Sequence, residues 1–319
     1  MYNNVKLEKG LYNLSGRSFS QALESLDPTE SYSGTPLANL DAFERQLKRF
    51  DIKVSGNDCD MVEKFFTTTE SAVLFPEFVR RCIRRGFDES VLNSITAVST
   101  KCESNMYTGC VLSDTEAYTV TSEGNSLPAT TVTEADTAVV LSKYGRIITA
   151  SYEALRQQKL DVFGVMLRSI GIKLANSVLS SAVTALKTDI SPISETSLTY
   201  DSLTDLYGSF DDFNMNCVVL SPANSAKVLA MAEMDDSYAD SQGKIRLPFG
   251  AEIVRTSAVD DSTIIGIDRD FALEIVSSSD LVLETDKLID RQLDRIAVSV
   301  NCGFRRITDD AVKVLAITV

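Results

Sequence analysis

Nucleophilic and acid-base catalysis usually depend on an imidazole that titrates near neutral pH, and this sequence of 319 residues contains no histidine. Ser-His-Asp and Cys-His nucleophile activation, H-E-x-x-H zinc sites and histidine acid-base chemistry are therefore all excluded. Ser241 and Lys244 match S-x-x-K, but they lie in a polar, glycine-containing stretch rather than at the start of an apolar helix. This match does not support a catalytic serine.

The remaining motifs for phosphate or carboxylate chemistry are also missing. Neither G-x-G-x-x-G nor G-x-x-x-x-G-K-[ST] occurs in the sequence. The adjacent acids Asp235–Asp236 and Asp260–Asp261 lack the D-T-G or D-S-G setting of an aspartic protease dyad. The sequence thus predicts a protein that is not an enzyme, with no catalytic residue, no cofactor and no metal site.

Six cysteines are scattered along the chain without a C-x-x-C spacing: Cys59, Cys82, Cys102, Cys110, Cys217 and Cys302. This pattern fits reduced thiols used as small apolar residues better than a disulfide framework. The first ten residues are polar, and no run approaches the roughly 18 apolar residues of a membrane span. We therefore expect an intracellular, soluble protein without a secretion signal or a transmembrane helix.

The formal net charge of -14 is unevenly distributed. Residues 191–284 carry 5 Lys and Arg against 17 Asp and Glu, whereas residues 145–190 carry 6 against 3. Binding to nucleic acid phosphates needs clustered cations, so the acidic balance disfavours specific DNA recognition.

The elements that would position any binding residues begin with a segmented arm over residues 1–64. One short helix is expected from Phe19 to Leu26, and Asp41 with Glu44 indicates a capping box for a second. The apolar residues expected on one face of the second helix are Phe43, Leu47 and Phe50. Because these apolar stripes are narrow, both helices must dock on the rest of the chain or on a neighbouring molecule.

Residues 67–87 indicate a short extended run that turns into a helix, with Pro76 near its start and Gly86 near its end. Four arginines share one face of that helix, namely Arg80, Arg81, Arg84 and Arg85. A solvated helix face is one interpretation of this pattern, and a binding surface is the other.

Residues 101–144 are rich in Thr and Ser, alternate around Tyr118, and contain turn signals at Gly124 and Pro128. A long β-hairpin is expected here. It has too few apolar residues to pack on itself, so it should project and lie on another molecule.

The longest helical pattern runs from Asp161, its expected cap, to Leu186, and we interpret Gly164 and Gly171 as sites of close helix packing. From residue 198 the pattern alternates between helices and strands, with a buried strand at 217–220 and a helix start at Ser221-Pro222. The chain closes with a period-2 strand over 296–304 and a further strand over 312–319.

The order of these elements resembles the major capsid protein of tailed double-stranded DNA bacteriophages, a fold shared with encapsulin shells. The resemblance lies in TTESAVLFPEFVRR, SLPATTV followed by KYGRIITASYEALR, DVFGVMLRSIGIKLANSVLSSAV, VVLSPANSAKVLAM, and LPFGAEIVRTSAV leading to IIGIDRDFALEI. It implies an α+β fold with an N-terminal arm (1–64), a projecting β loop (101–144) and two domains. These are a peripheral domain (65–100, 145–190 and 285–319, with a spine helix at about 161–187) and an α/β axial domain (191–284).

The resemblance further implies a subunit of an icosahedral shell, with an encapsulin compartment as the alternative and an unrecognised hydrolase a distant third. The implied partners are copies of the chain in hexamers and pentamers, a portal, a separate scaffolding or decoration protein, and packaged DNA contacted without sequence specificity. No membrane partner is implied. The implied location is the virion, after assembly in the cytoplasm of a bacterial host.

In a shell, the candidate contact residues acquire specific roles. The four arginines could pair with carboxylates of an adjacent subunit or face DNA, while Phe43, Leu47, Phe50 and Tyr118 would lie in subunit contacts. Acidic axial domains around one axis would repel each other, so Asp235, Asp236, Asp260 and Asp261 are candidates for compensation by basic residues or bound cations. A solvated acidic rim is the other interpretation.

Two departures from the family pattern are expected. Some members join subunits through an isopeptide bond from a lysine on the projecting loop, but Lys101 and Lys143 lie at the base of this loop. We therefore predict no such crosslink. Only about 64 residues precede the peripheral domain, which favours a separate scaffolding protein, or none, over an N-terminal scaffolding segment.

Overall fold

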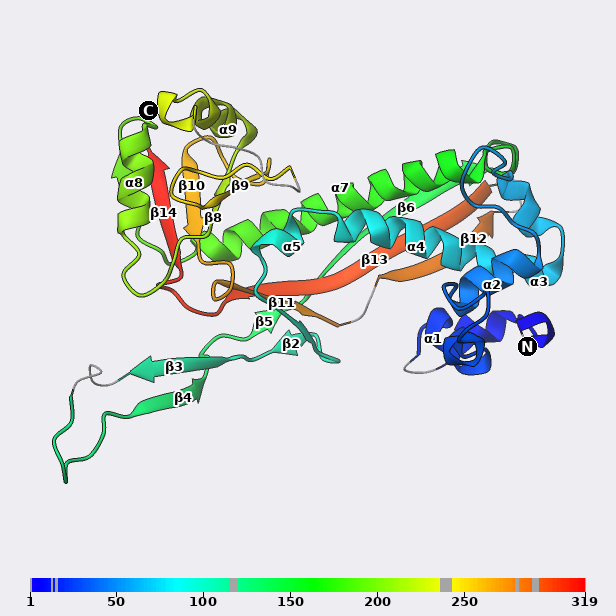
Figure 1. The fold of residues 1–319 in the computed structure, drawn as a ribbon, viewed down its shortest axis with the longest axis horizontal. Helices are drawn as coiled ribbons and strands as arrows, with labels where there is room; N and C mark the ends of the chain where they lie inside the picture. Colours follow the sequence, from blue (N-terminus) through cyan, green and yellow to red (C-terminus); the bar gives the residue numbers. More distant parts are fainter. Residues whose placement is uncertain are drawn as a thin grey trace. The chain divides into compact units, whose positions relative to one another are not determined.

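Figure 1 shows the computed structural model of the protein, which describes residues 2–12, 14, 17–114, 120–235, 243–278, 281–288 and 293–318. The chain forms two compact units, each assembled from separate stretches of sequence. Unit 1 comprises Met1–Glu89, Gly145–Leu174 and Leu281–Ser299, and unit 2 comprises Ser90–Tyr144, Ala175–Asp280 and Val300–Val319. Helix α7 and strand β13 contribute residues to both units.

Unit 1 is mainly helical. Its helices are η1 (Tyr2–Asn4), η2 (Lys9–Tyr12), α1 (Phe19–Leu26), η3 (Thr29–Tyr32), α2 (Ala42–Arg49), η4 (Val62–Phe66), α3 (Thr69–Ala72), α4 (Leu74–Asp88), α6 (Tyr152–Arg156) and the first half of α7 (Leu160–Lys187). Its strands are β6 (Ser142–Ser151), which begins in unit 2, β12 (Val282–Leu288) and the first half of β13 (Leu293–Arg306). Strand β13 lies between β12 and β6, with Leu283 of β12 opposite Val298.

Both helices expected in the N-terminal segment are present. Helix α1 has the expected bounds, and α2 starts as expected but ends at Arg49, so Phe50 is its C-cap rather than part of its apolar face. The Asp41 side chain accepts from the backbone N–H of Glu44, and the Glu44 side chain accepts from the N–H of Asp41, so the capping box at the start of α2 is confirmed. Phe19 and Leu23 of α1 are buried within the chain, whereas Leu26 is exposed. The narrow apolar stripe thus packs on the protein's own core.

The segment before α4 is not extended as expected. Thr68 caps α3 by accepting from the N–H of Ser71, which makes a helical turn directly before α4. Pro76 is consequently the third residue of α4, and Gly86 lies inside the helix rather than at its end.

Close packing between α4 and α7 explains two glycines. A Cβ on Gly171 of α7 would lie 2.0 Å from the carbonyl oxygen of Ile83, and one on Gly86 of α4 would lie 2.0 Å from that of Arg168. Only glycine permits this backbone approach. The interpretation of Gly171 as a packing site is therefore confirmed, whereas a Cβ on Gly164 would make only ordinary contacts, with Cys82 and Phe78.

Helix α7 begins at Leu160, one residue earlier than expected. Asp161 is therefore its second residue and not its cap, and the Asp161 side chain accepts from the N–H of Val162. Among the residues that the structure describes, α7 is the only helix long and apolar enough to cross a membrane by length and composition, with a mean hydropathy of 1.4 over 18 residues. The sequence analysis did not identify this apolar stretch of 18 residues. A helix in the core of a protein meets the same criteria of length and hydropathy, and α7 buries Leu167, Leu174 and Leu179.

Unit 2 contains a five-stranded sheet in the order β7-β14-β10-β8-β9. These strands are β7 (Ile193–Glu195), β8 (Cys217–Leu220), β9 (Glu252–Arg255), β10 (Thr263–Ile267) and β14 (Val312–Ile317). The helices of the unit are α5 (Leu92–Ile95), α8 (Tyr200–Gly208), α9 (Pro222–Leu229), η5 (Ala232–Met234) and the second half of α7. Ser221 caps α9 and Pro222 is its first residue, as expected.

The core of this sheet includes Leu203, Leu206, Val218, Val228 and Ile264. Strand β14 pairs with β10 and β7, so the last two strands of the chain belong to different sheets. A period-2 pattern reveals the buried face of a strand but not the strand that it pairs with.

The second half of β13 pairs with β11 (Leu273–Ser277), and β11 pairs with β1 (Val98–Lys101). Between β1 and β6 the chain forms two short antiparallel pairs, β2 (Met106–Tyr107) with β5 (Val139–Val140) and β3 (Cys110–Asp114) with β4 (Thr130–Glu134). We call these two pairs the ribbon. The pair β3–β4 lies farther from β11 than the pair β2–β5 (Figure 1).

Candidate assembly surfaces

The ribbon exposes apolar side chains on a structure too thin to bury them. Leu112 of β3 and Val132 of β4 are directly opposite each other and are 70% and 65% exposed. Leu127 and Val120, between the two strands, are also exposed. A two-stranded ribbon is only marginally stable alone in water, so these side chains are suited to contact with another molecule. Tyr118, the predicted contact residue here, lies outside the described residues.

A buried carboxylate lies at the base of the ribbon. Glu274 of β11 is 4% exposed and accepts hydrogen bonds from Thr100 Oγ1, Tyr107 Oη (3.2 Å) and Arg305 Nε (2.6 Å). Burial alone would raise the pKa of Glu274, but the hydrogen bonds from Thr100 and Arg305 and the positive charge of Arg305 outweigh it, so the pKa is lowered. Glu274 is therefore a stable anion at neutral pH.

The four arginines of α4 are all paired with carboxylates of their own chain. Arg80 and Arg81 bind Glu77, and Arg81 also binds Asp41. The two arginines nearer the end of the helix form exposed pairs, Arg84 with Asp88 at 3.5 Å and Arg85 with Glu89 at 3.2 Å. This helix face carries both signs of charge, which weakens the case for a phosphate-binding surface. Contacts of these arginines with a second subunit remain a prediction.

Glu77 holds the N-terminal segment onto α4. Its carboxylate is fully buried and binds Ser20 of α1 as well as the two arginines. The N–H of Glu77 donates to the Tyr12 hydroxyl, which in turn donates to the carbonyl of Val73. The N-terminal segment is thus docked on its own chain by polar contacts as well as apolar ones.

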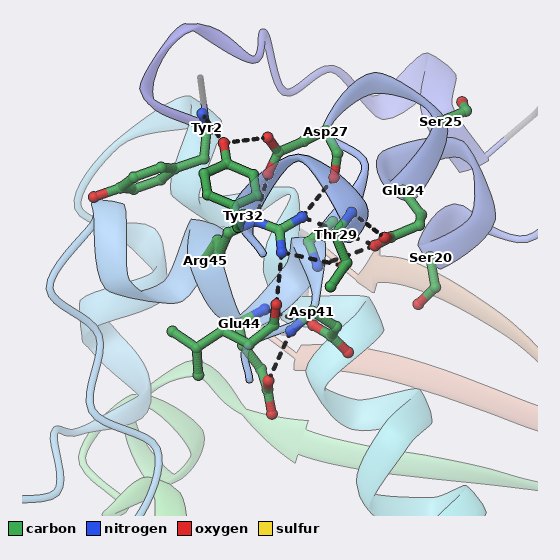
Figure 2. A network of polar contacts seen from close by, with 12 residues as sticks. Tyr2, Ser20, Glu24, Ser25, Asp27, Thr29, Tyr32, Asp41, Glu44 and Arg45 are labelled. Carbon is green, nitrogen blue, oxygen red and sulfur yellow. Dashed lines mark hydrogen bonds and ion pairs between the residues drawn. The ribbon is translucent and has the colours of Figure 1, made fainter. Parts of the chain in front are cut away.

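A second buried network ties the N-terminal helices together, as Figure 2 shows. The Arg45 guanidinium binds the side chain and carbonyl of Asp27 and the carbonyl of Leu40, and lies over the ring of Tyr32. Glu24 accepts from the N–H groups of Thr29 and Ala42, linking the end of α1 to the start of α2. Burial tends to raise the pKa of Glu24, but these bonds lower it overall.

The apolar residues predicted as contacts in the N-terminal segment are mostly covered. Phe43 and Leu47 are buried within the chain, and the Arg81 guanidinium lies 4.3 Å from the centre of the Phe43 ring. Phe50 remains partly exposed beside Arg49. Of the three, Phe50 is the residue with surface available to a neighbour.

The aspartates predicted as candidates in the acidic region have different surroundings in the structure. Asp260 is exposed and pairs with Lys187 of α7 at 3.4 Å, while the carbonyl of Asp261 accepts from Asn224. Asp235 is exposed at the end of η5, and Asp236 lies outside the described residues. In the part of the chain that the structure describes, no three His, Cys, Asp or Glu side chains gather as a metal site.

Sequence reasoning did not single out Glu77, Arg45, Glu274 or Arg305. A signal was available for Glu274, which interrupts the otherwise apolar run from Phe271 to Val276. A charged residue in a strand that is apolar on both sides often marks a buried, paired charge. The partners of Glu274 come from distant parts of the sequence and leave no local pattern.

The fold is similar to that of solved capsid, virus-like particle and encapsulin structures. It is similar to a virus-like particle from Pyrococcus furiosus, with a TM-score of 0.51 at 13% identity over 75% of this chain and 98% of that one. It is also similar to the capsid of a native GTA particle, with a TM-score of 0.53 at 15% identity over 74% of this chain and 91% of that one. The resemblance and the fold class expected from the sequence are thus confirmed.

A third similar structure is the holo-SrpI encapsulin complex from Synechococcus elongatus PCC 7942, with a TM-score of 0.50 at 14% identity. The alignment covers 70% of this chain and 89% of that one. No protein-family model matches the sequence, and no curated protein matches it. The likeness is therefore carried by the three-dimensional fold rather than by residue identity.

Proposed function

We propose that this protein is a structural subunit that assembles with copies of itself into a closed icosahedral shell, as the major capsid protein of a tailed bacteriophage. The observation that carries the proposal is a fold shared with the capsid of a GTA particle and a virus-like particle over about three quarters of the chain. A non-catalytic role agrees with the complete absence of histidine. The shell would enclose a double-stranded DNA genome.

The exposed ribbon supports this function because its apolar side chains need a partner that its own strands cannot provide. A shell distributes many modest contacts over several neighbours, so no single interface has to be large. In this proposal copies form hexamers and pentamers, with residues 191–284 near their axes and residues 101–144 over a neighbour. A portal and a scaffolding or decoration protein complete the particle, which assembles in the bacterial cytoplasm and is found as the virion.

An encapsulin-type compartment is the second candidate, favoured by the similarity to the holo-SrpI encapsulin complex. The two candidates differ in what the shell contains. DNA in particles purified from the native host would support the capsid, and a copurifying enzyme would support the encapsulin.

Electron microscopy of the purified recombinant protein, together with its mass by light scattering, tests the shared part of the proposal. Hollow particles, or rings of five and six subunits, are expected. The same preparation is then mixed with extract from cells that make the whole particle, which supplies any scaffolding protein. A uniform monomer or dimer under all salt conditions, with and without that extract, would overturn the proposal.

A further inference from the structure

We infer that Glu274 and Arg305 form an anchor that sets the direction of the ribbon, and that shell assembly depends on this anchor more strongly than folding does. The inference rests on the proposed function, because it assigns to the ribbon the task of reaching a second copy of the chain. Glu274 and Arg305 are positioning residues in this proposal.

The anchor connects strands from four places in the sequence. Glu274 lies on β11 and binds donors from β1, β2 and β13, through Thr100, Tyr107 and Arg305. Arg305 then donates from Nη2 to the carbonyl of Cys110, the first residue of β3, at 3.1 Å. One ion pair, between the buried Glu274 and the half-buried Arg305, thus contacts both strands on the N-terminal side of the ribbon, β2 and β3.

The packing around Arg305 is equally close. A Cβ on Gly109 would lie 2.0 Å from Cζ of Arg305, so the backbone before β3 lies directly against the guanidinium. The opposite side of the ribbon contacts β13 two residues earlier, where a Cβ on Gly303 would lie 2.5 Å from Cγ1 of Val139. Residues two apart on a strand share one face, so both sides of the ribbon lie on the same face of β13.

Among the described residues, the outer part of the ribbon has little apolar packing of its own. Its outer pair buries no apolar core of its own, because Leu112 and Val132 are exposed. Its orientation must therefore be fixed where it leaves β13, and a small change in angle there is multiplied along the ribbon. The anchor is charged as well as close-packed, so removal of the Arg305 cation leaves the buried Glu274 carboxylate without its ion-pair partner.

The decisive variant is Arg305→Lys, which keeps a cation for Glu274 but loses the planar group that lies against Gly109 and the Nη2 donor to the carbonyl of Cys110. Glu274→Gln is the companion variant, since it preserves shape and removes the negative charge. Asp309→Asn is the matched control because Asp309 is exposed and pairs at 2.5 Å with Arg306, the residue that follows Arg305. If Glu274→Gln does not fold, Arg305→Lys still decides the question.

Three quantities are measured for the full-length chain: thermal unfolding, hydrogen exchange of peptides within residues 101–144 in unassembled subunits, and the yield of closed shells. Loss of one hydrogen bond from a charged donor should raise the rate of amide hydrogen exchange in the ribbon by about tenfold. Such a bond changes the equilibrium constant for local opening by about this factor. Arg305→Lys should also lower the shell yield by a similar factor while Tm shifts by a few degrees at most, and Asp309→Asn should behave like the wild type.

Unchanged ribbon exchange in Arg305→Lys would overturn the anchor, whatever happens to assembly. Faster exchange with a normal shell yield would overturn its role in assembly. A global loss of exchange protection would also overturn it, because it would show a contribution to folding instead. If the wild type forms no shells, the proposed function fails, whereas the exchange measurement still decides whether Arg305 anchors the ribbon.

Discussion

The guanidinium of Arg45 is completely buried, and its Nε donates to a carboxylate oxygen of Asp27 at 2.7 Å. Asp27 follows α1 and Arg45 lies in α2, so this ion pair joins two helices that each have only a narrow apolar face. Removing two charges from water has a large free-energy cost, and a buried pair of this kind specifies one arrangement of the chain more than it adds stability. The N-terminal segment is accordingly held in one arrangement by matched charges.

Arg45→Met should destabilise the protein by about 3–5 kcal/mol, because it leaves the Asp27 carboxylate buried without its cation. The measurement is the free energy of unfolding by urea, followed by circular dichroism. Glu8→Gln is the control, since Glu8 pairs with Lys6 on the surface and should cost no more than about 1 kcal/mol. Equal losses of unfolding free energy in Arg45→Met and Glu8→Gln would contradict the importance assigned to burial of the Arg45–Asp27 ion pair.

The two glycines of α7 should respond in opposite directions to the same substitution. Gly171→Ala places a Cβ against the carbonyl of Ile83 and should destabilise by about 1–3 kcal/mol, since the two helices would have to separate. The Cβ of Gly164→Ala would make ordinary contacts with the Cys82 sulfur at 3.6 Å and Cζ of Phe78 at 3.9 Å, so the variant should stabilise by up to about 1 kcal/mol through helix propensity. Thermal unfolding of the two variants compares them directly, and a stabilising Gly171→Ala would refute the close approach of α4 and α7.

Glu77 should make stability depend on acid pH. Burial alone would raise its pKa, but hydrogen bonds from Arg80, Ser20 and Arg81 outweigh burial and lower the pKa below its ordinary 4.5. A carboxyl group with a lower pKa in the folded state stabilises fully above its unfolded pKa, and this contribution is lost as the pH falls through the folded value. Unfolding free energies should therefore decrease below pH 4.5.

Glu77→Gln should remove part of this acid dependence and lower stability at neutral pH, since Arg80 and Arg81 lose their shared anion. Glu63→Gln is the matched control, because Glu63 is exposed in η4. Identical pH profiles of the wild type and Glu77→Gln would show that Glu77 does not carry the dependence.

Local signals in the sequence were sufficient for elements defined by neighbouring residues. The capping box of Asp41 and Glu44 and the Ser221-Pro222 signal act within one helical turn, so the starts of α2 and α9 could be predicted. Gly86 was misread as a helix end, because the backbone that it contacts belongs to α7, about 80 residues later.

The candidate contact surfaces were predicted less completely. The sequence placed the arginines of α4 on one face, but could not show that Glu77 is paired with Ser20, 57 residues away, or Glu274 with Thr100, 174 residues away. Such pairs depend on tertiary contacts, which leave no periodic pattern. The exposed ribbon was expected because its composition alone is too polar for a core.

The cysteines offer a direct test of the ribbon as a contact surface. Burial raises the pKa of the Cys217 and Cys302 thiols to about 12 and that of Cys82 to about 11, so these residues form little reactive thiolate. Cys110 is exposed at the start of β3. With a maleimide at about pH 7, Cys110 should be modified first in unassembled subunits, since exposure and thiolate content control the rate.

In assembled shells the modification of Cys110 should slow by at least about tenfold, because the neighbouring copy that covers the ribbon excludes the reagent. Mass spectrometry of peptides after short labelling times measures each cysteine separately, and Cys110→Ser identifies the fast phase. Cys217 serves as an internal reference, since it is buried in both states. Equal labelling of Cys110 before and after assembly would show that the base of the ribbon stays uncovered, and the subunit contact would then have to lie beyond β3 or elsewhere on the chain.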